Sequence, residues 1–135
     1  MAEDIRVLLI EPLTEPRLVT IEHTLENLQK LVGGDIQAVY PWEDCVGLIV
    51  SDEGKLLGYP ANRLLCDEDG KAYDVICGSF FICGLGREDF CSISDEMAEK
   101  YTQKFQHPEM FIRTARNKVL CFKLGSGEPP LEISY

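Results

Sequence analysis

The stretch TLENLQKLVGGDIQAVYPWEDCVGLIVSDEGKLLGYPANR, residues 24–63, decides the fold that we expect for this chain. It starts as a short amphipathic helix, for which Thr24 can supply the N-cap and Gly33 the left-handed residue that commonly ends a helix. Two apolar strands follow, the first ending near Pro41, and then an acidic glycine turn and a loop that ends at Asn62-Arg63. This order predicts a compact unit of one helix and two strands.

Apolar runs on both sides of this unit predict further strands. Arg6–Ile10 has the continuous apolar character of a strand buried on both faces, and Leu18–Ile21 follows a turn as its hairpin partner. The longest apolar run, Val75–Cys83, predicts the deepest strand, with Gly78 at a bulge. Val119–Leu124 predicts a last strand.

A second helix is expected after the longest apolar run. Ser92 or Ser94 can cap it, and Met97, Tyr101 and Phe105 would form its core face. The sequence therefore predicts an α+β fold, with a mixed or mainly antiparallel sheet of about five or six strands and two helices against one face. At 135 residues the chain suits one domain, which we expect over 1–124, with 125–135 as a loosely held tail.

The charge balance is acidic and bears on possible partners. Asp and Glu number 23 against 13 Lys and Arg, which gives a formal net charge of -10. Such a surface repels phosphate backbones and anionic lipid, so we expect no direct binding to nucleic acid and none to a membrane. A cytoplasmic protein is expected, since no secretory signal is visible at the start of the sequence. An acidic surface that competes with nucleic acid for a basic protein remains an alternative.

The sequence predicts neither a metal site nor a cofactor. Its six cysteines include no C-x-x-C pair and no zinc-finger spacing with histidine, and in a cytoplasmic protein they should stay reduced. Cys77 and Cys83 lie in an apolar run and are expected to be small core residues. The glycines at Gly84 and Gly86 lack the third glycine of a dinucleotide-binding loop, because position 89 is Asp89.

Enzymatic catalysis has little support in the sequence. No G-x-S-x-G or H-E-x-x-H motif is present, and the histidines are only His23 and His107, each expected at a helix end. We therefore expect no enzyme. A cysteine nucleophile assisted by a distant histidine remains an alternative.

Two polar loops form the candidate ligand-binding site. One contains Trp42 and Asp44, and the other ends in Asn62 and Arg63. An arginine fork can bind a carboxylate or phosphate bidentately while an aromatic ring offers a stacking face, so these four side chains could form a polar cleft. The alternative is that Arg63 pairs with Asp44 or Glu43 and that Asn62 only shapes the turn.

Several motifs occur together in an order that resembles a known family. They are Thr24-Leu25, Leu28-Gln29, Val32-Gly33-Gly34, Val39-Tyr40-Pro41, Asp44, Glu53-Gly54-Lys55-Leu56, Gly58, Pro60, Asn62-Arg63, Asp67–Lys71, Ile82–Leu85 and Glu88-Asp89-Phe90. From about Val7 to Phe111 the chain resembles the family known as domain of unknown function three-eight-four-six. The resemblance implies that this chain is one of a group of proteins encoded by gut-associated bacteria, phages and conjugative elements. It implies no activity and no catalytic residues, because none is established for the family.

Two functions follow as hypotheses. The first is a non-enzymatic accessory protein of a mobile element or its bacterial host, which acts by binding a protein partner such as a host protein. The second is a small-ligand module that binds an anionic or nucleotide-like molecule through Trp42, Asp44, Asn62 and Arg63. A concave site joining the two loops would favour the second function, and a flat apolar or acidic patch would favour the first.

Overall fold

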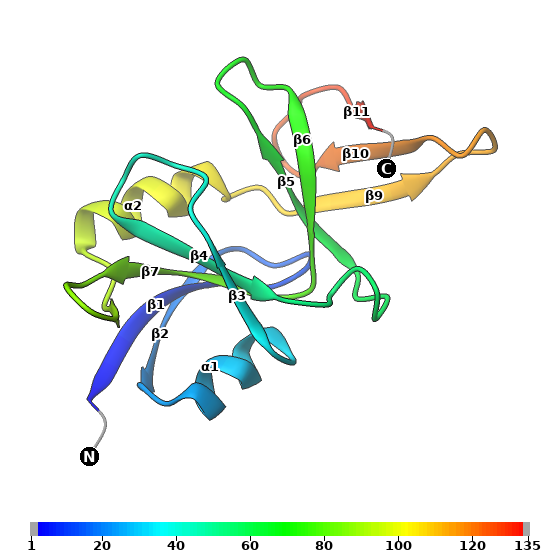
Figure 1. Ribbon diagram of the computed structural model, residues 1–135. Helices are drawn as coiled ribbons and strands as arrows, with labels where there is room; N and C mark the ends of the chain where they lie inside the picture. The colour runs from blue at the N-terminus through cyan, green and yellow to red at the C-terminus, as the bar shows by residue number, and fades with distance from the viewer. Residues whose placement is uncertain (1–2, 134–135) are drawn as a thin grey trace.

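The largest element of the fold is an antiparallel sheet, seen in a computed structural model that describes residues 3–133. Five strands follow the order β2-β1-β7-β4-β3, and the sixth, β8, pairs with the end of β7 (Figure 1). The six strands are β1 (Asp4–Ile10), β2 (Arg17–Glu22), β3 (Ile36–Val39), β4 (Val46–Ser51), β7 (Phe80–Leu85) and β8 (Phe90–Cys91). The α+β class and the antiparallel sheet are confirmed.

The central strands β1 and β7 are buried on both faces. Leu8 of β1 and its partner Ile82 of β7 point into one apolar core, whereas Val7 and Phe81 point into a second core on the opposite face. The continuous apolar run of β1, in place of an alternating pattern, is the sequence signature of this position. Its predicted hairpin with β2 is confirmed by six antiparallel residue pairs.

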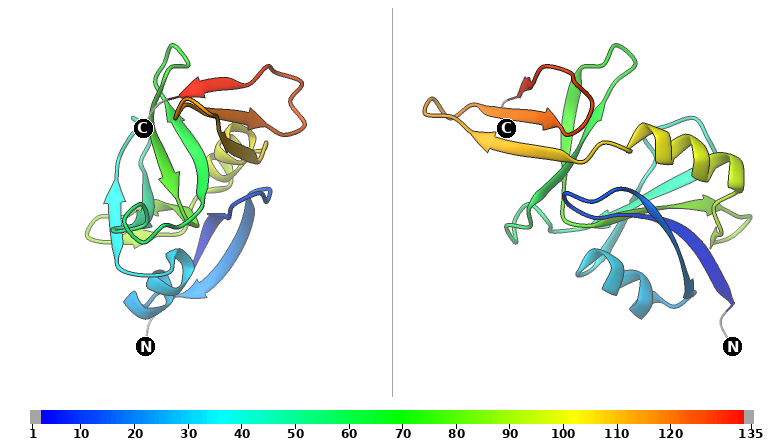
Figure 2. Two further views of the ribbon diagram at one scale, coloured as in Figure 1. Left: turned by 90° about the vertical axis from the view of Figure 1, so that its right-hand side faces the viewer. Right: turned by 180° about the vertical axis from the view of Figure 1, so that it is seen from behind.

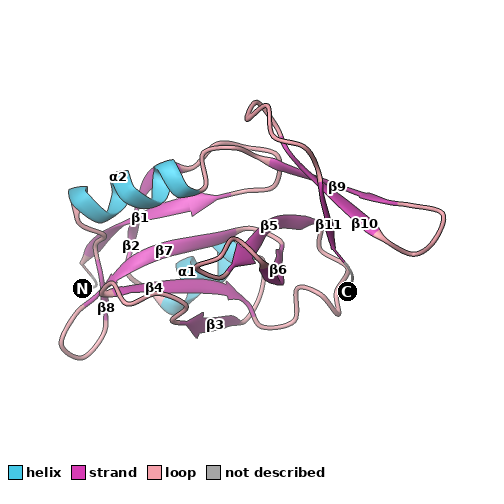
Figure 3. Ribbon diagram, turned by 90° about the horizontal axis from the view of Figure 1, so that it is seen from above, coloured by secondary structure: helices cyan, strands magenta, loops and turns pink. Residues whose placement is uncertain are grey.

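The two helices cover opposite faces of the main sheet. Helix α1 (Leu25–Val32) packs with the core that contains Val7, and α2 (Asp95–Lys104) packs with the core that contains Leu8 (Figures 1 and 3). The expectation that both helices lie against one face is therefore wrong. The physical reason is that the central strands carry apolar side chains on both faces, and each face needs its own cover.

The helix ends agree with the sequence. The Thr24 hydroxyl oxygen accepts a 3.1 Å hydrogen bond from the Asn27 backbone N–H, and Gly33 ends α1 in the left-handed conformation with φ of 81°. At α2 the cap is Ser94, whose hydroxyl oxygen accepts from the Met97 N–H. Ser92, the other candidate cap, instead accepts from the Arg6 N–H of β1.

Two small sheets complete the fold, and one of them contains the strand predicted over Val119–Leu124. They are the hairpin of β5 (Ala61–Cys66) and β6 (Ala72–Cys77), and the C-terminal sheet of β9 (Glu109–Arg113), β10 (Val119–Lys123) and β11 (Leu131–Ile133). One face of the β5-β6 hairpin packs Leu65 and Ile76 into the core under α2, and the other packs Leu64 and Val75 against the C-terminal sheet. The hairpin therefore lies between the main sheet and the C-terminal sheet, whose β9-β10 ribbon extends away from the main sheet (Figure 2).

The structure revises one predicted strand. The run Val75–Cys83 is not one strand, because the chain turns at Gly78 with φ of 87° and passes from β6 into β7 of a different sheet. A side chain at Gly78 is excluded, since its Cβ would lie 2.8 Å from the Tyr59 ring. Within the C-terminal segment 125–135, Leu131–Ile133 forms β11 and pairs with β10.

Candidate functional site

Asn62 lies in the interior of the protein and not in a loop. It belongs to β5 and is fully buried, with 0% of its surface exposed. Its side-chain amide donates hydrogen bonds of 2.9 Å to the backbone carbonyls of Ile10 and Gly78. Asn62 therefore ties β5 to the end of β1 and to the turn before β7, and the predicted loop position was wrong.

Arg63 is buried beside Asn62 and also binds backbone. Its guanidinium Nη2 donates to the carbonyl oxygens of Thr14 at 2.7 Å and Phe105 at 3.1 Å, and Nη1 donates to Asn62 Oδ1 at 2.8 Å. Phe105 is the C-cap of α2, where the partial negative charge of the helix dipole favours a cation. Burial lowers the pKa of Arg63, opposed by the nearby Glu109 charge. Since all three guanidinium nitrogens bind within the protein, the group works as a structural clamp.

Trp42 and Asp44 lie against α2. The Trp42 ring centroid is 4.5 Å from that of Tyr101 and 6.0 Å from that of Phe105. Asp44 Oδ2 accepts hydrogen bonds from Lys100 Nζ at 2.5 Å and from the Tyr101 hydroxyl at 2.7 Å. The bond from Lys100 is the main reason that the pKa of Asp44 is lowered, whereas burial, then Asp44, raises the pKa of Tyr101.

The structure does not bring Trp42, Asp44, Asn62 and Arg63 together in one open cleft. Both pairs contact Phe105, but Trp42 packs on its ring while Arg63 binds its backbone carbonyl from the buried side. The alternative pairing of Arg63 with Asp44 or Glu43 is not formed either, because Asp44 binds Lys100 and Tyr101 while Arg63 binds Asn62, Thr14 and Phe105. Sequence proximity to acidic residues misled both interpretations.

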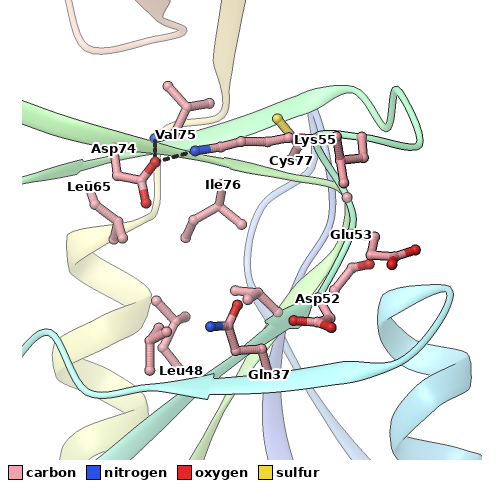
Figure 4. Close-up of a pocket in the computed structure, with 15 residues that line it drawn as sticks. Gln37, Leu48, Asp52, Glu53, Lys55, Leu65, Asp74, Val75, Ile76 and Cys77 are labelled. Atoms are coloured by element: carbon pink, nitrogen blue, oxygen red, sulfur yellow. Dashed lines mark hydrogen bonds and ion pairs between the residues drawn. The ribbon is translucent and has the colours of Figure 1, made fainter. Parts of the chain in front are cut away.

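A groove lies between the β3-β4 edge of the main sheet and the β5-β6 hairpin. Its volume is about 420 Å³. Leu48, Leu65 and Ile76 form a buried apolar floor, and the partly buried Val39 and Val50 extend it (Figure 4). We call this surface, lined by Gln37, Val39, Leu48, Val50–Leu56, Leu65 and Asp74–Cys77, the groove.

The turn at 52–58 forms one wall of the groove. Gly54 packs so closely on β6 that a Cβ there would lie 2.6 Å from the Cys77 carbonyl oxygen, so only glycine fits. Backbone hydrogen bonds from the Leu57 N–H to the Glu53 carbonyl and from the Tyr59 N–H to the Gly54 carbonyl order the turn. The ordered turn holds Leu56 and Leu57 in solvent, with 87% and 55% of their surfaces exposed.

The rim of the groove is polar and mainly acidic. Lys55 Nζ in the turn forms a 2.5 Å ion pair with Asp74 Oδ1 of β6. Asp52 and Glu53 are exposed and have no ion-pair partner in the described part of the chain (Figure 4). The groove thus combines an apolar floor with two unpaired carboxylates.

Sequence reasoning passed over the groove, although one signal was visible. Leu56 and Leu57 stand side by side between Gly54 and Gly58, in a segment too short and too rich in glycine to be a buried strand. Two adjacent leucines in a turn have no core position to fill, and this points to an exposed apolar surface. The remainder of the groove depends on the packing of β5-β6 against the main sheet, which local patterns do not encode.

Within residues 3–133, neither histidine is hydrogen-bonded to a thiol. Burial raises the pKa of both Cys83 and Cys121 to about 12, which keeps these thiols protonated at neutral pH. His23 Nε2 lies 3.7 Å from Asp89 Oδ2, and His107 Nδ1 lies 3.1 Å from the Leu124 carbonyl oxygen.

Residues 3–133 contain neither a metal-binding cluster nor a membrane-spanning helix. No three His, Cys, Asp or Glu side chains in this range meet in an arrangement that could hold a metal ion. Neither helix of the described chain has the length and apolar character needed to cross a membrane.

Comparison with known proteins finds a family whose matched region contains the groove. The model described as Domain of unknown function (DUF3846) matches residues 5–106, so it includes every groove-lining residue and ends before β9. Searches of curated proteins and of solved structures each gave no match. Because the matched region covers well over half of the sequence, the chain belongs to the family described as Domain of unknown function (DUF3846).

Proposed function

We propose that the protein is a non-enzymatic binding protein that docks a protein partner in the groove. The observation that carries this proposal is the exposure of Leu56 and Leu57 on an ordered turn beside the apolar floor. Exposed apolar patches rimmed by polar residues mark interaction sites in soluble proteins. A partner that covers the turn would bury both leucines together with the floor.

The open form of the groove favours a protein over a small molecule. Its volume of about 420 Å³ lies within the range of small-ligand sites, but such sites enclose most of the ligand surface. Here Leu56 forms part of the wall and also projects into solvent, with 87% of its surface exposed. A partner with a surface of its own can cover both the floor and Leu56.

The alternative function, small-ligand binding by Trp42, Asp44, Asn62 and Arg63, is the weaker proposal. The polar groups of Asp44, Asn62 and Arg63 already have partners within the protein, and Asn62 and Arg63 have no exposed surface. An anionic ligand would have to break the bonds that join Arg63 to Phe105 and Thr14. The groove requires no such rearrangement.

The family context extends the proposal to a biological role. Proteins that resemble this chain occur in gut-associated bacteria, phages and conjugative elements, and small acidic proteins of mobile elements often act by binding host proteins. We therefore propose an accessory protein of a mobile element or its bacterial host, acting in the cytoplasm on a host protein. The acidic surface, with its net charge of -10, supports a protein partner over nucleic acid.

Affinity capture with matched variants tests the docking surface. The tagged protein and its Leu56→Asp/Leu57→Asp variant are used to recover proteins from a bacterial host extract, and recovered proteins are identified by mass spectrometry. The control is Leu25→Asp, which replaces a leucine of 60% exposure at the start of α1. We expect a partner that the wild type and the control recover and the double variant loses. Recovery of the same proteins by all three would remove the groove as the docking site.

A further inference from the structure

We infer that the groove takes an extended segment of the partner in which apolar residues alternate with lysine or arginine. This inference rests on the proposed function and specifies the chemistry of the segment that docks. Three features of the molecule support it: the charge of the rim, the strands along the groove and the size of the groove.

The charge of the rim selects a cationic occupant. Three carboxylates line the groove, from Asp52, Glu53 and Asp74, against one described base, Lys55. Lys55 is already bound to Asp74, so the carboxylates of Asp52 and Glu53 are the groups left to meet a partner. A docked acidic segment would be repelled, and a docked neutral segment would leave both charges without a partner. Lysine or arginine satisfies them.

The whole protein strengthens this preference at longer range. Its formal net charge is -10, so its field attracts cationic segments and repels anionic ones before contact. Nucleic acid is repelled by the same field, and its phosphates would meet Asp52 and Glu53 at the rim. A basic protein segment is therefore the favoured class of macromolecule.

The strands along the groove favour an extended occupant. Asp74–Cys77 of β6 line the groove consecutively, although side chains of a strand alternate between two faces. The groove therefore follows the edge of β6 and not only one of its faces. On the other side Gln37 and Val39 line it from β3, the outermost strand of the main sheet. Gln37 and Val39 are two residues apart, as are Leu48 and Val50 of β4, so on this side the groove lies over one face of the main sheet. An extended chain can lie along β6, which among the described strands pairs only with β5, and place its side chains on that face.

The size of the groove favours an extended segment over a helix that enters it whole. A helix with its side chains is about 10–12 Å wide, so a single turn would occupy roughly 400–600 Å³. The groove, at about 420 Å³, would be filled by that one turn. In an extended segment every second side chain points the same way, so a few apolar side chains can reach Leu48 and Ile76 while the charged ones stay at the rim.

The test uses three short labelled peptides that differ only at alternate positions. The apolar residues are the same in each, and the variable positions carry lysine, glutamine or glutamate. Binding is measured by fluorescence anisotropy at low and raised salt, with spermidine as a small polycation competitor. We expect the lysine peptide to bind about tenfold more tightly than the glutamine peptide, to weaken with salt and to bind better than spermidine.

Charge-neutralised variants assign the effect to the rim. Asp52→Asn/Glu53→Gln should weaken binding of the lysine peptide about tenfold and leave binding of the glutamine peptide nearly unchanged. The control Glu68→Gln/Asp69→Asn removes the same charge from the exposed tip of the β5-β6 hairpin and should change neither. All four substituted side chains are exposed, so the variants should fold, and circular dichroism checks that they do.

Several outcomes would overturn the inference. In the peptide experiment these are equal binding of the three peptides, tighter binding of the glutamate peptide, no binding of the lysine peptide, or full displacement of the lysine peptide by spermidine at matched charge. In the variant experiment it is an equal loss of lysine-peptide binding in both charge-neutralised variants. The proposed function fails separately, through captured partners that are insensitive to Leu56→Asp/Leu57→Asp. If those partners were lost but the lysine peptide did not bind, the docking surface would stand and only its cationic specificity would be withdrawn.

Discussion

Two polar regions, one within the β5-β6 hairpin and one beside it, differ in what their polar side chains bind. Inside the protein, Asn62 and Arg63 have no exposed surface and direct their nitrogens at backbone carbonyls. At the groove, Asp52 and Glu53 are exposed and have no ion-pair partner within residues 3–133. The side chains of the first region therefore stabilise the fold, whereas those of the second are free to bind another molecule.

The largest loss of stability is expected for Arg63→Met, in the buried region. Methionine fills much of the volume but donates no hydrogen bond, so the buried Phe105 carbonyl and the part-buried Thr14 carbonyl both lose their partner. We expect the free energy of unfolding, measured in urea, to fall by about 3 kcal/mol. The control Lys55→Met breaks only an exposed ion pair and should cost under about 1 kcal/mol. Equal losses would contradict the contrast between the two regions.

A smaller loss is expected for Asn62→Leu. The Ile10 and Gly78 carbonyls each lose a 2.9 Å bond, which should reduce the free energy of unfolding by about 2 kcal/mol. Because Asn62 Oδ1 also accepts from Arg63, the losses in Asn62→Leu and Arg63→Met should not add in the double variant. Additive losses measured in urea would show that the two side chains act independently.

The sequence predicted those parts of the fold that local chemistry controls. Thr24 and Gly33 bound α1 because a hydroxyl cap and a left-handed residue act within a few positions. The run Arg6–Ile10 predicted a central strand because it is apolar on both faces, although the consequence, one helix on each face, was not drawn. Gly78 was expected at a bulge, but its φ of 87° lets the chain leave one sheet for another.

The candidate site could not be predicted to the same extent. An Asn-Arg pair in a polar stretch is typical of a surface loop, and only the tertiary structure supplies the carbonyls that satisfy Asn62 and Arg63 inside β5. The groove arises where β6 packs near β3, strands far apart in the sequence. Leu56 and Leu57 are the part of the groove that the sequence could indicate, because two leucines in a turn bounded by glycines have no core position to fill.

Glu109 gives a pH-dependent test of the buried region. It is 5% exposed and accepts hydrogen bonds from the Leu64 N–H and the Cys121 thiol, and burial raises its pKa. A raised native pKa means that the folded protein binds this proton more tightly than the unfolded chain. Glu109 therefore makes stability fall as pH rises from the usual carboxyl pKa through the raised native value.

The variant Glu109→Gln isolates this contribution. Glutamine keeps an oxygen that can accept from the Leu64 N–H but carries no titrating proton. We expect the stability of Glu109→Gln relative to the wild type to increase as pH is raised through that window, in urea unfolding measured at several pH values. A difference between the two proteins that stays constant with pH would show that Glu109 titrates alike in the folded and unfolded states.

The smallest stability effect is expected for Leu56→Asp/Leu57→Asp, and this variant separates the two regions most clearly. With 87% and 55% of their surfaces exposed, these leucines lose little burial when replaced, so the free energy of unfolding should change by no more than about 0.5 kcal/mol for each substitution. The same variant is expected to lose its captured partner. A stability loss as large as that of Arg63→Met would mean that the leucines support the fold, and the groove would then have no exposed apolar surface dedicated to binding.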